Sequence, residues 1–162
     1  MSEQERLTAY HEAGHIVAAY ASGLEVGWAT IEPTEDALGR AHTPLRDDIA
    51  YVWECSNESE DDEYLEKHLV CLVAGAKAEE LLTGEEHDLE GTDFERAADF
   101  VLHLAGSEEE RQLEVSGKAF DEAERLLRRN WHVVERLAAQ LAEHRTLSAE
   151  RVVEIVKGEI HA

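Results

Sequence analysis

Apolar and small residues fill most positions of the first twenty residues and predict a buried helix. Ser2 followed by Glu5 has the form of a capping box, and Ser22-Gly23 would end the helix. Apolar side chains fall on most faces of this helix, which is typical of a helix inside a core: Leu7, Tyr10, Ile16, Val17 and Tyr20. We therefore expect the chain to open with a buried helix.

A change of pattern after residue 25 predicts a small sheet. The segment from Val26 to Glu32 is rich in β-forming residues and ends at Pro33, so it predicts a short strand. Residues 34–63 hold Gly39, Pro44 and many acidic side chains, which indicates loops with a further strand around Arg40 to Thr43.

Helical spacing returns and continues to the end of the chain. Tyr64 to Leu82 forms one apolar helical segment, and Thr92 with Glu95 makes a second capping box before the next. From Leu113 to Leu141 apolar residues recur every three or four positions, as in a helical hairpin or one long helix; Ser148 then caps a last short helix. We expect a mainly α (α+β) fold with about five helices and a small two- or three-stranded sheet beside the first helix, in one domain over residues 1–162.

The strongly negative charge of the chain argues against a nucleic-acid partner. The 162 residues carry 15 basic against 37 acidic side chains, a formal net charge of −22, and no basic stripe occurs. Such a chain repels a phosphate backbone, so we expect no nucleic-acid partner. The plainest interpretation of the acidity is solubility or adaptation to salt.

Cysteine usage and hydropathy favour a soluble protein of a reducing compartment. Cys55 and Cys71 do not form a disulfide framework, and Cys71 lies in an apolar helical run. The start of the chain is polar and unlike a signal peptide, and the longest apolar run, Leu69 to Ala76, is too short to span a bilayer. We expect a cytoplasmic protein without membrane insertion.

The first helix carries the pattern H-E-x-x-H. His11 and His15, four residues apart, lie on one helix face and could bind a common Zn²⁺. Zinc lowers the pKa of coordinated water to about 7, so Glu12 between the two histidines is placed to act as general base. The competing interpretation is two partly exposed histidines on an alanine-rich helix.

A catalytic zinc site needs a third protein ligand, and spacing alone leaves it open. No histidine follows His15 within ten residues, and the candidates are Glu79, Glu80 and Asp93. Asp93 could equally compensate the charge at a helix N-terminus. The remaining histidines lack ligand spacing and are interpreted as surface or core residues: His42, His68, His87, His103, His132, His144 and His161.

A family resemblance extends the motif through the chain. The helix segment Thr8-Ala-Tyr-His-Glu-Ala-Gly-His15 resembles the metal-binding helix of the FtsH family of ATP-dependent zinc proteases. Further segments match that family in order: Ala29-Thr-Ile-Glu-Pro33, Leu38-Gly-Arg-Ala41, Leu72-Val-Ala-Gly-Ala-Lys-Ala-Glu-Glu-Leu81, Gly91-Thr-Asp93, Asn130 to Leu141 and Thr146-Leu147.

The resemblance implies a zinc metalloendopeptidase acting on unfolded or flexible polypeptides. By it, His11, His15 and Asp93 would bind Zn²⁺ and Glu12 would be the catalytic base, with Glu79 or Glu80 supporting the ligands. The strand within Val26 to Glu32 would pair with the backbone of an extended polypeptide substrate.

The chain also departs from that family. It contains no G-x-x-x-x-G-K-[ST] phosphate loop, and we expect neither an ATPase module nor a membrane anchor in it. Thr92 and Lys77 stand where the family usually has Asn and Arg, and the acidic loop from Thr34 to Tyr64 matches poorly. A separate ATPase and a homo-oligomer therefore stay open as partners. The alternative function is a catalytically silent zinc-binding or partner-docking module, and a metal-free helical scaffold is a third hypothesis.

Overall fold

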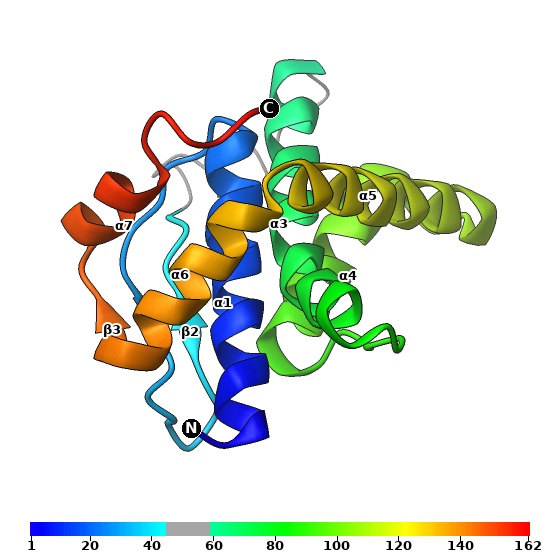
Figure 1. Ribbon diagram of the computed structural model, residues 1–162. Helices are drawn as coiled ribbons and strands as arrows, with labels where there is room; N and C mark the ends of the chain where they lie inside the picture. The colour runs from blue at the N-terminus through cyan, green and yellow to red at the C-terminus, as the bar shows by residue number, and fades with distance from the viewer. Residues whose placement is uncertain (45–58) are drawn as a thin grey trace.

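The computed structural model describes residues 1–44 and 59–162, and it is mainly helical with a small sheet (Figure 1). The described part contains six helices and three strands, which confirms the predicted fold class. In chain order they are α1 (Glu3–Ala21), β1 (Ala29–Thr30), β2 (Arg40–Ala41), α3 (Ser59–Thr83), α4 (Gly91–Ala105), α5 (Glu109–Arg129), α6 (Trp131–His144), β3 (Thr146–Leu147) and α7 (Ala149–Val156).

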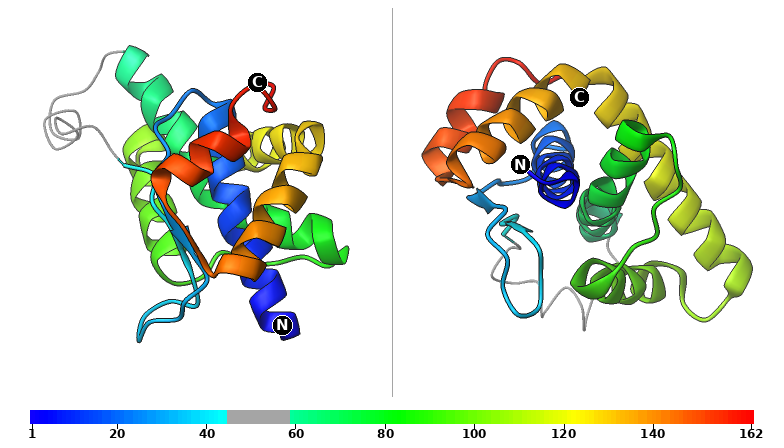
Figure 2. Two further views of the ribbon diagram at one scale, coloured as in Figure 1. Left: turned by 60° about the vertical axis from the view of Figure 1, so that its left-hand side comes forward. Right: turned by 60° about the horizontal axis from the view of Figure 1, so that its bottom comes forward.

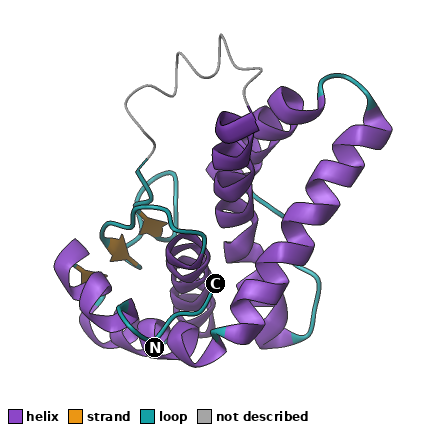
Figure 3. Ribbon diagram, turned by 90° about the horizontal axis from the view of Figure 1, so that it is seen from above, coloured by secondary structure: helices purple, strands orange, loops and turns teal. Residues whose placement is uncertain are grey.

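Helix α1 is the centre of the molecule. It packs on α3 along one side and on α6 and the sheet along the other (Figure 2). Figure 3 shows the strands gathered in one part of the otherwise helical molecule. Its middle is almost fully buried, as the all-round apolar pattern predicted. The predicted capping box is present: Ser2 Oγ accepts from the Glu5 N–H, and Glu5 Oε2 accepts from the Ser2 N–H.

Helices α1 and α3 approach each other closely because both carry small residues. A Cβ added at Gly14 would lie 2.6 Å from the Ala74 carbonyl oxygen and 2.7 Å from the Ala78 Cβ. Any side chain at position 14 would therefore push the two helices apart. The absence of a side chain at Gly14 therefore permits the short distance between α1 and α3. The candidate site described below depends on that distance.

The sheet is antiparallel in the order β2-β1-β3. Its strands are shorter than the predicted segments Val26 to Glu32 and Arg40 to Thr43, although single hydrogen bonds continue the pairing on both sides of β1. Gly27 N–H donates to the His42 carbonyl, and Ile31 N–H donates to the Arg145 carbonyl.

The prediction that the Val26 to Glu32 strand binds a substrate backbone is wrong. β1 is the central strand, and its backbone groups are already paired with β2 and β3 on its two edges. A third chain has no edge of β1 to add to. Within the described residues it is β2 and β3 that lie at the edges of the sheet.

Arg145 joins the sheet to the start of α1. Its guanidinium donates to a Glu5 carboxylate oxygen at 2.9 Å and also to Glu32. The backbone N–H of Ser2 and the Arg145 side chain lower the pKa of Glu5 to about 2. The first turn of α1 is thus fixed on the C-terminal part of the chain.

Several predicted boundaries are corrected. The helix expected from Tyr64 already begins at Ser59, so residues 59–63 are not loop. The second capping box is wrong: α4 begins at Gly91, which takes a φ of 54°, its N-cap is Glu90, and Thr92 lies within the first turn. The helical segment expected from Leu113 begins earlier, because α5 starts at Glu109. It is also not one long helix, because Asn130 separates α5 from α6.

Two further expectations are confirmed, and one concerns a residue outside the described part of the chain. Ser148 caps α7, as predicted, by accepting from the Arg151 N–H, and Cys71 is buried in α3. Cys55 lies outside the described residues. Among the helices that the structure describes, none combines the length and the apolar character needed to cross a bilayer.

Candidate metal centre

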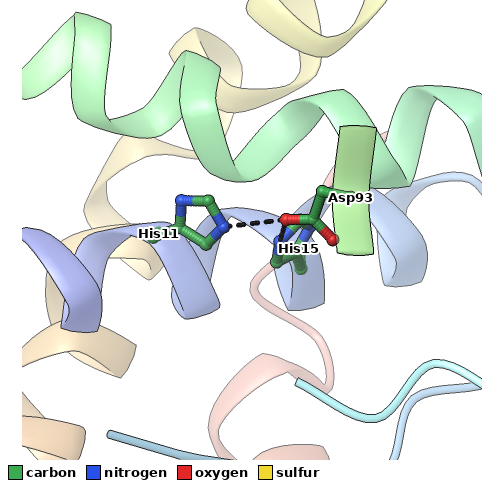
Figure 4. A group of neighbouring side chains, drawn as sticks. All are labelled: His11, His15 and Asp93. Atoms are coloured by element: carbon green, nitrogen blue, oxygen red, sulfur yellow. Dashed lines mark hydrogen bonds and ion pairs between the residues drawn. The ribbon is translucent and has the colours of Figure 1, made fainter. Parts of the chain in front are cut away.

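Three side chains from α1 and α4 converge on one another. His11 and His15 project from α1, and Asp93, in the first turn of α4, points its carboxylate between the two rings (Figure 4). Asp93 Oδ2 lies 3.0 Å from His11 Nε2 and 3.1 Å from His15 Nε2. If each residue offers one ligand atom, these three atoms all lie within 4.8 Å of one another.

The other nitrogen of each ring is held by a protein acceptor. His11 Nδ1 donates to Glu79 Oε1 at 2.5 Å, and His15 Nδ1 donates to the Cys71 carbonyl at 2.7 Å. Because a carbonyl and a carboxylate can only accept, both Nδ1 atoms carry the proton. The two Nε2 atoms are then the nitrogens that can offer a lone pair, and both face Asp93.

The geometry and the donor set fit a zinc ion. Two imidazole nitrogens and a carboxylate oxygen are donors that zinc prefers, and ligand atoms around a tetrahedral zinc lie roughly 3.4 Å apart. The Asp93 oxygen, 3.0 and 3.1 Å from the two nitrogens, lies within about 0.4 Å of that spacing from each. The hydrogen-bonded Nδ1 atoms fix the ring orientations, as in known zinc sites.

Gly75 of α3 leaves the space in front of the two rings. A Cβ at this position would lie 2.5 Å from His11 Nε2 and 2.6 Å from His15 Nε2. Only glycine, whose side chain is a hydrogen atom, leaves this space open. The sequence pattern did not single out Gly75, although it falls in the small-residue helix that carried the family resemblance.

Electrostatics tie the three groups together. Burial lowers the pKa of His15, but the charge of Asp93 outweighs it and raises this pKa well above the ordinary value. Burial likewise lowers the pKa of His11, and hydrogen bonds to Asp93 and Glu79 raise it overall. Burial raises the pKa of Asp93, but the charge of His15 and the hydrogen bonds from both histidines outweigh it and leave the value well below normal. The two imidazoles and the carboxylate therefore each favour the charged form of the other.

Glu12 lies on the same helix between the two histidines and is buried at 5% exposure. Burial raises its pKa, while the charges of His15 and His11 lower it in part. Its carboxylate faces the sheet, because a Cβ at Gly39, next to β2, would lie 2.7 Å from Glu12 Oε1. The base predicted from the motif therefore lies between the histidine pair and the edge strand.

The structure separates the two glutamates that the sequence left as alternatives. Glu79 contacts His11, whereas Glu80 accepts from Lys77 Nζ at 2.9 Å. Lys77, at the family's usual arginine position, is buried between Glu80 and Glu124 of α5, so it joins α3 to α5.

His87 is a second residue beside the site, after Gly75, that the sequence pattern did not single out. His87, interpreted as an ordinary surface or core histidine, places Nδ1 3.1 Å from the second oxygen of Glu79. Nothing in its spacing from His11 or His15 gave a signal, because the contact forms only when the α3–α4 connection folds back.

Comparisons with known proteins match the chain over almost its whole length. It is 28% identical over 98% of the chain to the ATP-dependent zinc metalloprotease FtsH of Magnetococcus marinus, and 30% identical over 94% to FtsH of Thermus thermophilus. FtsH of Caulobacter vibrioides is 26% identical over 96% of the chain. No protein-family model matches. The chain spans less than a third of the length of these curated relatives.

Proposed function

We propose that this chain, which is a distant relative of the FtsH family, is a zinc-dependent endopeptidase domain that hydrolyses unfolded or flexible polypeptides. The observation that carries the proposal is the convergence of His11, His15 and Asp93, with Glu12 beside them and Gly75 leaving the space in front. The relatives' name, zinc metalloprotease, supports the same chemistry.

The proposed roles follow from the donor atoms. His11 Nε2, His15 Nε2 and an Asp93 oxygen would hold the ion, and three protein ligands leave a position open, as catalytic zinc requires. Zinc in such a site activates a water molecule and polarises the carbonyl of a scissile peptide. Glu12 would take the proton from the attacking water and deliver it to the leaving amine.

The environment of Glu12 suits a base. Its burial raises its pKa, which makes the carboxylate a better proton acceptor than one in water. The charges of His15 and His11 lower the same pKa in part.

Strand β2 replaces β1 as the proposed backbone partner of the substrate. β2 is an edge strand among the described residues, and Gly39, directly before it, lies against Thr8 and Glu12. An extended peptide added to this edge would run past the proposed base and be held by backbone hydrogen bonds with little demand on sequence. A separate ATPase belongs to the proposal as a candidate partner, because the name of the relatives includes ATP dependence. A homo-oligomer stays a second candidate partner.

The test compares the parent with Glu12→Gln, using casein as unstructured substrate and elemental analysis for zinc. The variant should keep one zinc per chain and lose at least about a hundredfold in cleavage rate, since the general base is gone. Glu3→Gln, an exposed substitution on the same helix, is the matched control and should cleave like the parent.

Three results contradict the proposal in different ways. Equal cleavage by Glu12→Gln would remove Glu12 from the chemistry. Stoichiometric zinc without turnover of any peptide would favour the silent zinc-binding or docking module. Absence of zinc after purification with zinc supplied would leave a metal-free helical scaffold.

A further inference from the structure

The two proposed zinc-binding rings are restrained by different kinds of group. The His15 ring is 9% exposed and donates to a main-chain carbonyl inside α3. The His11 ring is 22% exposed and donates to a glutamate side chain, whose rotatable bonds must themselves be fixed. The orientation of His11 therefore depends on whatever holds Glu79.

Both oxygens of the Glu79 carboxylate are engaged. Oε1 accepts from His11 Nδ1, and Oε2 lies 3.1 Å from His87 Nδ1. The Glu79 carboxylate is 19% exposed and the His87 ring 25%, so water screens this contact only in part. A carboxylate held at both oxygens loses most of its rotational freedom.

His87 is itself tied to the end of α3. Its Nε2 lies 3.1 Å from Thr83 Oγ1, and the Thr83 hydroxyl donates to the Glu79 carbonyl at 3.0 Å. The contacts of His87 thus form a closed ring over the last turn of α3. This ring sits in the connection that leads, six residues later, to Asp93.

We propose that His87 is a positioning residue that fixes the Glu79 carboxylate and, through it, the His11 ring in its metal-binding orientation. The inference rests on the proposed zinc site and assigns a role that neither the motif nor the spacing of the histidines gives. Groups that orient zinc ligands from outside typically change metal affinity by about 10- to 100-fold when removed.

The experiment measures zinc affinity by competition with a chromogenic chelator for the parent, His87→Ala, Glu79→Ala and the double variant. His87→Ala should bind zinc about tenfold more weakly. In the Glu79→Ala background the same change should alter affinity by less than about twofold, because the group through which His87 acts is already absent. His132→Ala, which removes an exposed histidine 4.0 Å from Glu159, is the matched control and should bind like the parent.

Two conservative variants separate positioning from a simple loop anchor. An asparagine amide nitrogen takes the place of Nδ1, so His87→Asn keeps the contact with Glu79 and should restore zinc affinity to within about threefold of the parent. A glutamine amide reaches the place of Nε2, so His87→Gln keeps only the Thr83 contact and should stay weak. Circular dichroism and thermal unfolding report whether each variant is folded.

The outcomes are distinct. Parental affinity in His87→Ala, equal losses with and without Glu79, or rescue by glutamine in place of asparagine would each overturn the role of His87 while leaving the zinc site intact. A parent chain that binds no zinc would overturn the proposed function, and this inference with it.

Discussion

The two halves of the candidate site achieve the same geometry by different means. At His15 the restraint is a backbone carbonyl in the middle of a buried helix, which no side-chain change can remove. At His11 it is a chain of side chains, Glu79 and then His87, that reaches to the surface. The His15 half is therefore fixed by the fold, whereas the His11 half can be altered residue by residue.

The largest effect should come from the residue that both halves share. Gly75→Ala places a methyl group 2.5 and 2.6 Å from the two Nε2 atoms, so neither ring can keep its place. Zinc affinity, measured by chelator competition, should fall by more than about a hundredfold, because ligand positions tolerate deviations of only ~0.2 Å.

Gly117→Ala is the matched control for this change. Gly117 lies within α5, and a Cβ there meets nothing within 4 Å. Alanine at this position should leave zinc affinity unchanged and stabilise the helix by up to about 1 kcal/mol. If Gly75→Ala bound zinc like this control, the space in front of the two rings would not be the metal position.

The proton content of the two halves should set the pH dependence of metal binding. Both histidine pKa values lie above the ordinary value, so their protonated forms stabilise the chelator-treated protein at low pH, and that stabilisation is lost as pH rises through the raised values. Zinc must displace these protons, so its affinity should fall with decreasing pH, by up to about a hundredfold per unit where two protons compete.

NMR titration of the ring protons in chelator-treated protein checks the cause. Both rings should titrate above their ordinary range, because each Nε2 lies beside the Asp93 carboxylate. Zinc binding isotherms at several pH values give the companion measurement. Ordinary titration of both rings together with pH-independent zinc affinity would contradict the proposed contact with Asp93.

The smallest effect should come from the side chain nearest the His15 restraint. Cys71→Ala removes a thiol that contacts the His15 carbonyl but leaves the Cys71 carbonyl that holds the ring. Zinc affinity should stay within about twofold of the parent, and the free energy of unfolding should fall by about 1 kcal/mol. A large loss of zinc affinity would mean that the thiol, and not the backbone, positions His15.

Spacing left the third ligand open, and only the family resemblance singled out Asp93. The sequence alone determined the helical class of the fold and the shared helix face of His11 and His15. Both follow from local rules: a repeat of 3.6 residues buries one side of a helix, and histidines four residues apart lie on one face. The capping boxes show the limit of such rules. Ser2 caps α1 as predicted, whereas at Thr92 the same pattern failed: the helix begins two residues earlier, at Gly91 with its positive φ, and Glu90 is its N-cap.

Only the tertiary structure decided which strand is central, which glutamate supports the site, and where Gly75 and His87 lie. β1 became the middle strand because the distant β3 pairs with it, and no local pattern reports that pairing. Glu79 and Glu80 are neighbours in sequence, yet the helix turns one toward His11 and the other toward Lys77. The contact of Glu79 with His11 joins residues 68 positions apart, so it depends on how closely α1 and α3 pack. The small residues Gly14 and Gly75 permit that distance, and the whole fold sets it.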